Sequence, residues 1–260
     1  MTGQSNTRPQ ARQGDTADMP EAAASPPLLE ARGLDTFYGS SHVLRAIDFH
    51  VAPHETVSLL GRNGMGKTTL LRTFMGLVRP RAGRVRLNGA DITAARPSAI
   101  ARAGIAFVPE GRGIFPNLTT EENLTFAARG ARDGRPGWSL ERIYDMFPRL
   151  AARRRNWGNQ LSGGEQQMLT ISRALMTNPD LILLDEATEG LAPMARDVIW
   201  ETLRLVAASG VAIVVVDKNL VDLFDLASRH VILSKGTVVF EGPTEALRGD
   251  QELIHRTLGV

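Results

Sequence analysis

The segment GRNGMGKTT, residues 61–69, constrains the fold of this chain more than any other feature. It follows the apolar run TVSLL and precedes the helical pattern LLRTFMGL, which is the strand–loop–helix context of a phosphate-binding loop. Glycines in such a loop let backbone N–H groups curl around phosphate oxygens, Lys67 carries positive charge to them, and the Thr68 hydroxyl can ligate Mg²⁺. We therefore predict an α/β fold in which this loop binds a phosphate-bearing ligand.

Two later apolar runs end in acidic residues: LILLDE at residues 181–186 and VAIVVVD at residues 211–217. Such runs are typical of parallel strands buried on both faces, whose polar ends meet a ligand at the carboxyl edge of the sheet. Phosphoryl transfer needs a metal ligand and a group that positions water. We predict that Asp185 holds Mg²⁺ through water and that Glu186 orients and polarises the attacking water.

The remaining segments predict an antiparallel unit and a helical unit. Alternating apolar residues and short turns in residues 28–60 indicate antiparallel strands, and residues 83–92 add a further strand with an Asn-Gly turn. Residues 230–242 indicate a late hairpin. Thr119 and Glu122 have the spacing of a capping box, and residues 139–147 have an apolar helical face. Both features predict a helical insertion at about residues 111–160.

The segment LSGGEQQMLTISRAL, residues 161–175, predicts a helix that opens at Ser162, Gly163 and Gly164. Free backbone N–H groups at the start of a helix form an anion site. Nothing nearby along the chain completes a phosphate pocket, so the anion must come from another part of the structure.

Composition restricts the class of protein. The chain has 260 residues, 43% of them hydrophobic, enough for one substantial domain. Its 30 basic and 28 acidic residues are spread without a long basic run, so we expect no nucleic-acid partner. The absence of Cys excludes disulfides, and no apolar run is long enough to span a membrane. We expect residues 1–27, which are polar and rich in small residues, to be a disordered extension before a domain at 28–260.

The motifs GRNGMGKTT, LSGGEQQ and LILLDE, in that order, resemble the ATP-binding cassette of ABC transporters over essentially all of the chain from Leu28 onward. The resemblance implies an ATPase with a mainly parallel core sheet, an antiparallel β subdomain and a helical subdomain. It also implies that two cassettes, identical or paralogous, meet head to tail. Ser162, Gly163 and Gly164 of one cassette would then complete the ATP site around the partner subunit's Lys67.

A closer resemblance comes from VPEGRGIFPNLTTEENL, MFPRL, LSGGEQQM and EGLAP, which are similar to the ATPase subunits of branched-chain amino-acid importers. This resemblance implies transmembrane permease subunits as partners, an indirect link to a solute-binding protein, and a peripheral position on the cytoplasmic face of the inner membrane. Three alternatives stay open: an importer of urea or another solute, a soluble non-transport ABC ATPase, and a regulatory nucleotide-binding module without turnover.

The resemblance also implies roles for individual residues. Mg²⁺ would be held by Thr68, Glu110 and Asp185, and catalysis would use Glu186 and Lys218. ATP would be bound by Tyr38, Gly61, Arg62, Asn63, Gly64, Met65, Gly66, Lys67, Thr68, Thr69, Ser162, Gly163, Gly164 and Glu165.

Several of these roles have a plain structural alternative. Tyr38 lies where the family stacks an aromatic ring on adenine, but a buried strand tyrosine is the rival interpretation. Most cassettes have Gln at the position of Glu110, and a Glu there resembles the amino-acid import branch. The alternative is that Glu110 is a solvated turn acid. Residues 189–192 would be the loop through which two cassettes sense each other, or an ordinary turn.

Lys218 is a departure from the family. After the strand VAIVVV the family generally places a switch His that contacts the γ-phosphate, and the amino-acid import branch often has Gln, whereas this chain has Lys218 in VVVDKNL. A lysine can bind the γ-phosphate by charge but cannot act as both donor and acceptor. The alternative is a solvent-facing lysine at the start of a helix.

Overall fold

The computed structural model describes residues 26–131 and 137–259. Its central feature is a six-stranded sheet in the order β10-β9-β3-β8-β7-β6, in which all neighbours are parallel except β10, which pairs antiparallel with β9. The strands are β3 (Thr56–Leu60), β6 (Ile105–Val108), β7 (Leu181–Asp185), β8 (Ala212–Val216), β9 (Arg229–Ser234) and β10 (Thr237–Pro243).

A second, antiparallel sheet has the order β2-β1-β4-β5. Its strands are β1 (Leu29–Tyr38), β2 (Ser41–Val51), β4 (Ala82–Leu87) and β5 (Ala90–Asp91). The expected turn between β4 and β5 is present, with Asn88 and Gly89 at φ 48 and 77. Two successive positive φ values are those of a type I′ hairpin turn, which Asn-Gly adopts readily.

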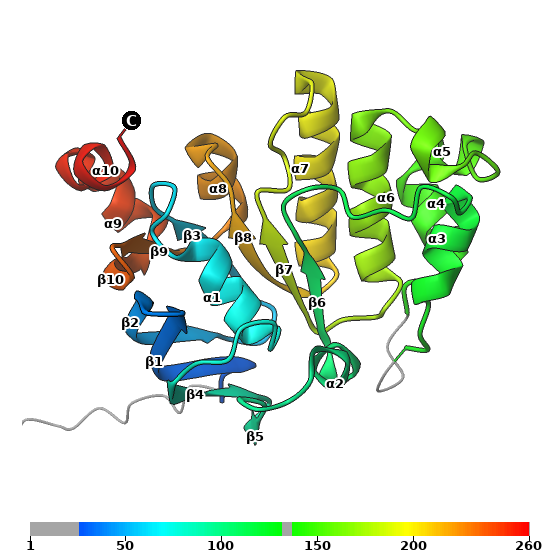
Figure 1. The fold of residues 1–260 in the computed structure, drawn as a ribbon. Coiled ribbons are helices and arrows are strands. Elements are labelled where there is room, and N and C mark those ends of the chain that lie inside the picture. Colours follow the sequence, from blue (N-terminus) through cyan, green and yellow to red (C-terminus); the bar gives the residue numbers. More distant parts are fainter. Residues whose placement is uncertain (1–25, 132–136, 260) are drawn as a thin grey trace, which may run out of the picture.

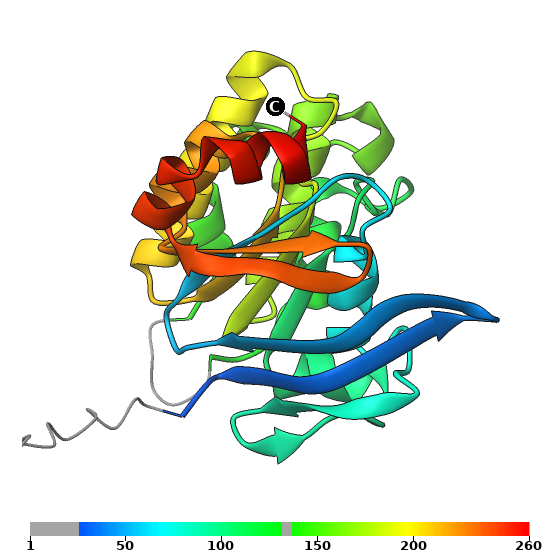
Figure 2. The same cartoon turned by 90° about the vertical axis from the view of Figure 1, so that its left-hand side faces the viewer.

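The helices cover both faces of the six-stranded sheet (Figure 1). Helix α1 lies between the two sheets, whereas α6 and α7 lie on the opposite face with the smaller helices α3, α4 and α5 beyond them (Figures 1 and 2). The helices are α1 (Lys67–Phe74), α2 (Pro97–Ala103), α3 (Thr120–Ala127), α4 (Leu140–Met146), α5 (Pro148–Ala152), η1 (Gly158–Gln160), α6 (Gly163–Leu175), α7 (Pro193–Ala208), α8 (Leu220–Leu226), α9 (Thr244–Gly249) and α10 (Gln251–Leu258).

The two apolar strands β7 and β8 are buried along their whole length. Successive side chains of a strand point to opposite faces. Accordingly, Ile182 and Leu184 join the core beneath α6 and α7, while Leu181 and Leu183 join the core around α1. Burial on both faces is the reason that these strands read as continuous apolar runs. The predicted fold class, a mainly parallel core sheet with an antiparallel sheet and a set of helices, is confirmed.

Local capping chemistry starts the helices where the sequence predicts. Thr119 Oγ1 accepts from the Glu122 backbone N–H at 3.2 Å and Glu122 Oε2 accepts from the Thr119 N–H at 2.7 Å, which is the capping box of α3. Ser139 caps α4 through the Arg142 N–H. Ile143 and Phe147 are buried on the expected apolar face.

The domain boundaries stay a prediction. Residues 1–25, most of the expected disordered extension, lie outside the described residues. Helices α3, α4 and α5 fall within residues 111–160, where the helical insertion is expected.

Candidate functional site

The phosphate-binding loop joins β3 to α1, as the sequence predicts. Lys67 is the first residue of α1 and its ammonium donates to the backbone carbonyls of Gly61 at 2.7 Å and Arg62 at 3.1 Å. Burial lowers the pKa of Lys67. Gly66 precedes the helix at φ 106, a backbone conformation that favours glycine, and a Cβ there would also press on the Leu44 side chain.

Thr68 meets Asp185 across the carboxyl edge of the six-stranded sheet. The Thr68 hydroxyl donates to Asp185 Oδ1 at 3.0 Å. Asp185 is 1% exposed, and burial raises the pKa of its carboxyl. A hydroxyl and a carboxylate oxygen at this separation are the hard oxygen donors that Mg²⁺ prefers, so the pair fits that ion.

Glu186 follows β7 with a left-handed backbone, φ 50. A residue other than glycine in this conformation carries strain, which is common at functional sites. The carboxylate of Glu189, followed by burial, raises the pKa of Glu186 to about 7. A hydrogen bond with Glu186 and the Lys218 ammonium lower the pKa of Glu189. Of the two acids, Glu186 is therefore the one that takes up a proton more readily.

Lys67, Thr68, Glu186 and Glu189 line one pocket of about 410 Å³, whereas the buried Asp185 does not itself line it. Tyr38, at the end of β1, lies on its rim and is 46% exposed, which does not match the rival interpretation of a buried tyrosine. Oxygens of Glu110, Glu186 and Glu189 lie within 4.8 Å of one another at the same place. The pocket is lined by Tyr38, Val43, Asn63, Gly64, Gly66, Lys67, Thr68, Thr69, Glu110, Glu186 and Glu189.

Two side chains of the phosphate-binding loop point elsewhere. The Arg62 guanidinium donates to the backbone carbonyl of His255 in α10 at 3.5 Å, and Met65 Sδ accepts from the Lys235 N–H at 3.1 Å. Neither residue lines the pocket. Any contribution of Arg62 and Met65 to nucleotide binding must come from their backbone.

The start of α6 lies in a different pocket, of about 390 Å³. Ser162 and Glu165 form a reciprocal capping box, because Glu165 Oε2 accepts from the Ser162 N–H at 2.8 Å and Ser162 Oγ accepts from the Glu165 N–H at 3.4 Å. Within residues 26–131 and 137–259, no acceptor bonds the N–H groups of Gly163 and Gly164. The start of α6 is thus separate from the pocket of Lys67, and its role in binding an anion stays a prediction.

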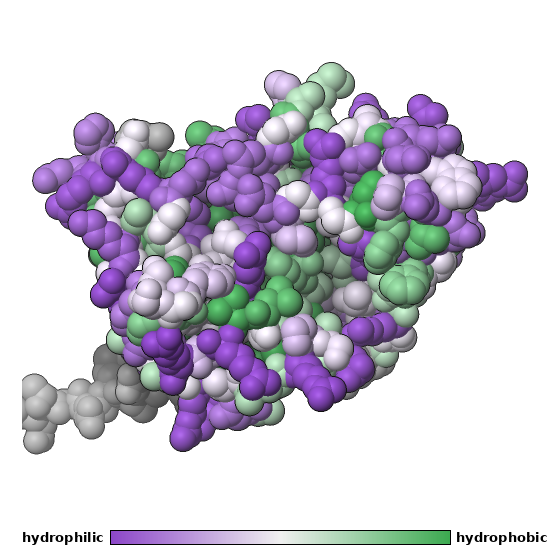
Figure 3. Space-filling model, in the orientation of Figure 1, coloured by the Kyte–Doolittle hydropathy of each residue, from purple (hydrophilic) through white to green (hydrophobic). Residues whose placement is uncertain are grey.

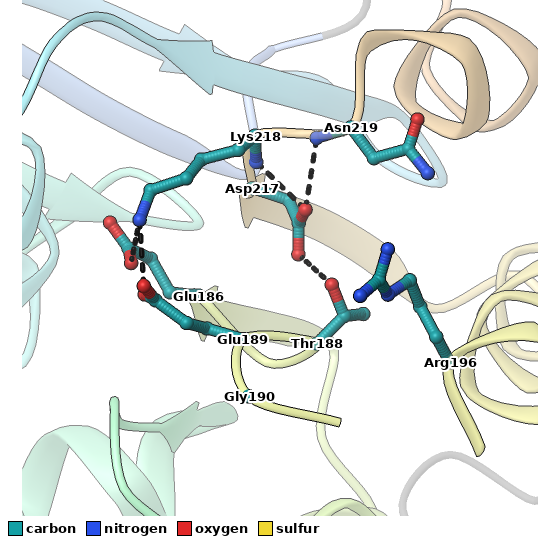
Figure 4. Close-up of a pocket in the computed structure, with 8 residues that line it drawn as sticks. All are labelled: Glu186, Thr188, Glu189, Gly190, Arg196, Asp217, Lys218 and Asn219. Atoms are coloured by element: carbon teal, nitrogen blue, oxygen red, sulfur yellow. Dashed lines mark hydrogen bonds and ion pairs between the residues drawn. The ribbon is translucent and has the colours of Figure 1, made fainter. Parts of the chain in front are cut away.

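Lys218 lies beside Glu186 and Glu189 and outside the pocket of Lys67. It lines a neighbouring pocket of about 480 Å³ with Glu186, Glu189, Asp217 and Arg196 (Figure 4). Its ammonium lies 2.7 Å from Glu189 Oε1 and 3.5 Å from Glu186 Oε2, and the Glu189 carboxylate raises the pKa of Lys218.

Sequence reasoning missed Arg112. Its guanidinium packs on Gly163, where a Cβ would lie 2.6 Å from Arg112 Nη2, and it donates to Gln166 Oε1 at 3.1 Å. Thr170 Oγ1 also bonds the Arg112 carbonyl. Arg112 stands two positions after Glu110, but nothing in its local pattern indicates that it covers the start of a helix far along the chain.

The chain matches one protein family. The profile of the family described as ABC transporter matches residues 44–189. The high-affinity branched-chain amino acid transport ATP-binding protein BraG of Pseudomonas aeruginosa is 36% identical over 232 residues, which cover 89% of this chain and 100% of that protein. The Nod factor export ATP-binding protein I of Paraburkholderia xenovorans is 37% identical over 235 residues, covering 88% of this chain and 73% of that protein.

The fold is also similar to that of solved structures from the same family. An ATP-binding subunit of an ABC transporter superposes with a TM-score of 0.75 at 30% identity, covering 89% of this chain and 96% of that chain. No helix in the described part of the chain is both long enough and apolar enough to cross a bilayer.

Proposed function

Because this chain belongs to the ATP-binding subunits of the ABC transporter family and is an ATPase, we propose that it powers the import of branched-chain amino acids. The observation that carries the solute class is the similarity to BraG over the whole length of that protein. The Nod factor relative has almost the same identity and is named for export, so direction and solute need a transport assay. Import of urea or another solute is the alternative.

The convergence of Lys67, Thr68, Asp185 and Glu186 supports the proposed ATP site. Lys67 and the backbone N–H groups of its loop bind the β- and γ-phosphates, and the exposed ring of Tyr38 stacks on adenine. Glu186 orients and polarises the attacking water. With a pKa near 7, Glu186 is poised to take up a proton at neutral pH.

Mg²⁺ is the metal that this donor set fits. Thr68 and Asp185 would hold the ion together with Glu110, which lines the same pocket and whose charge acts on the Asp185 carboxyl. When bound, Mg²⁺ neutralises charge on the phosphate oxygens. Lys218 is proposed to bind the γ-phosphate from the neighbouring pocket.

A second cassette is the proposed source of the anion at the start of α6. The unbonded N–H groups of Gly163 and Gly164 open to a pocket that holds no residue of the phosphate-binding loop. A head-to-tail dimer would place the partner subunit's ATP there, with Ser162, Gly163, Gly164 and Glu165 around its γ-phosphate.

The proposed contact with the permease lies on the helical region. Phe115, Phe126 and Trp157 are 43%, 74% and 49% exposed, and the rings of Phe115 and Phe126 meet edge to face at 5.5 Å. Apolar residues gather over this side of the molecule in Figure 3. An exposed aromatic cluster after Glu110 suits contact with a membrane-embedded partner, which supports our proposal that the chain works at the cytoplasmic face of the membrane.

ATP turnover by a Glu186→Gln variant tests the site. The amide keeps the shape but cannot accept a proton, so we expect ATP binding to persist and turnover to be nearly abolished. Glu201→Gln, an exposed change on α7, is the matched control and should behave as wild type. Turnover by Glu186→Gln at the wild-type rate would show that Glu186 is not the base.

Transport in reconstituted vesicles tests the solute. The cassette is purified together with membrane subunits that bind it, and uptake of labelled leucine, isoleucine, valine and urea is measured with and without ATP. ATP-dependent uptake of the three amino acids is expected. Uptake of urea alone would contradict the proposed solute, and ATP-dependent efflux would contradict the proposed direction. Failure of the chain to copurify with membrane subunits would favour a non-transport ATPase.

A further inference from the structure

The Lys218 ammonium is shared by two carboxylates in the structure. It lies 2.7 Å from Glu189 Oε1 and 3.5 Å from Glu186 Oε2 (Figure 4). Glu186 is largely buried, whereas the Lys218 and Glu189 side chains are 57% and 49% exposed. The closer contact of Lys218 is therefore with Glu189, the more exposed of the two acids. Glu189 is not among the residues for which the sequence predicts a role in catalysis.

The backbone around this ion pair is held by adjacent strands. Because β7 and β8 are parallel neighbours, the residues that follow them emerge side by side, and the Glu186 N–H donates to the Val216 carbonyl at 2.9 Å. Asp217 accepts from the Lys218 N–H at 2.7 Å and from the Thr188 hydroxyl at 2.5 Å. With both segments fixed, the long Lys218 side chain is the part that can change partner.

A γ-phosphate in the pocket of Lys67 would be another acceptor for the same ammonium. Glu189 and Glu186 line both the pocket of Lys67 and the pocket of Lys218, so the two pockets adjoin at these acids. ADP lacks the γ-phosphate, so only the triphosphate competes with Glu189 for the lysine.

We infer that Glu189 is a positioning residue that holds Lys218 away from the γ-phosphate and thereby limits the preference of the site for ATP over ADP. The inference rests on the proposed ATP site and on Lys218 as the γ-phosphate ligand. Separating the Lys218 ammonium from Glu189 costs the free energy that a partly exposed ion pair contributes. This free energy corresponds to about a two- to five-fold change in the affinity for ATP.

The position of Glu189 also connects this ion pair to the proposed dimer contact. Glu189 is followed by Gly190, which lines both the Lys218 pocket and the pocket at the start of α6. A cassette seated on that second pocket touches the residue next to Glu189. We therefore expect closure of the dimer around ATP to weaken the ion pair between Lys218 and Glu189.

Binding of β,γ-imido-ATP, which resists hydrolysis, and of ADP tests the inference. We expect Glu189→Gln to bind the triphosphate about two- to five-fold more tightly with unchanged ADP affinity. Glu189→Asp, which keeps a carboxylate, is expected to fall between wild type and Gln. Asp197→Asn, an exposed charge removal on α7, should leave both affinities unchanged.

A double-variant cycle separates the ion pair from simple charge repulsion. In a Lys218→Ala background, Glu189→Gln should no longer change the ratio of the affinity for β,γ-imido-ATP to the affinity for ADP. If the gain persists without Lys218, Glu189 repels the phosphate directly and the inference is overturned, as it also is if Glu189→Gln has no effect. Absence of nucleotide binding by the wild-type chain, or its persistence in Lys67→Ala, would instead refute the proposed ATP site.

Discussion

Acidification is expected to destabilise this chain through one buried histidine, His230 on β9. Its side chain is fully buried, with Nδ1 2.6 Å from Ser58 Oγ and Nε2 2.8 Å from Thr244 Oγ1. Thr244 donates its own proton to the Ala227 carbonyl at 3.1 Å, so Nε2 carries the imidazole proton and Nδ1 accepts from Ser58. Burial, followed by the charge of Arg248, lowers the pKa of His230 to about 4.

The magnitude follows from proton linkage. The unfolded chain has a His230 pKa of 6.5 and the folded chain one of about 4, so below 6.5 the unfolded chain takes up the proton first. Stability conferred by neutral His230 is present above 6.5 and is lost as the pH falls towards 4. Between pH 7 and pH 5 the loss is about 2 kcal/mol of the free energy of unfolding.

Urea unfolding of the wild type and a His230→Gln variant at pH 7 and pH 5 measures this loss. The variant is less stable at pH 7, because Gln cannot reproduce both hydrogen bonds, but it lacks the titrating group. Other ionisable groups are common to both chains, so the wild type should lose about 2 kcal/mol more than the variant on acidification. Equal losses in the two chains would refute the assignment of a neutral, buried His230.

Four further predictions concern the nucleotide site and the core. Lys67→Ala is expected to lose ATP affinity, measured by equilibrium binding, while thermal unfolding stays close to wild type. Gly61→Ala should lose ATP binding as well, because φ is 140 and the added Cβ would collide with the Leu233 carbonyl; unaltered binding would show that the loop tolerates a side chain. Mixed dimers of Ser162→Arg and Lys67→Ala chains should regain one intact composite site, and dimers that form without any ATPase activity would count against a head-to-tail arrangement. Phe147→Ala, at a position 1% exposed, should cost about 3–5 kcal/mol in urea unfolding, and a cost below about 1 kcal/mol would contradict its place in the core.

Features that depend on a few neighbouring residues were predictable. The phosphate-binding loop, the capping boxes at Thr119 and Ser162, and the Asn88-Gly89 turn are all present. Each is encoded within a short segment, because backbone conformation and capping hydrogen bonds act over three or four residues. The buried strands were predictable for a related reason, since burial on both faces requires a continuous apolar run.

Side-chain partners across the sheet could not be predicted in this way. Thr68 and Asp185 lie 117 residues apart, and their contact exists because β3, β7 and β8 end at the same edge of one sheet. The resemblance could place Asp185 near Thr68, but it gave no reason to expect the ammonium of Lys218 on Glu189.

Local sequence is enough to predict which segments form strands and helices, where the helices begin, and which loop binds phosphate. The contacts of Lys218 with two acids, the packing of Arg112 on Gly163, and the burial of His230 between two hydroxyls become visible only in the folded chain. The difference lies in the distance along the chain over which each interaction acts. Capping and turn formation depend on adjacent residues, whereas strand order depends on how the whole chain buries its apolar surface, and strand order selects which distant side chains meet.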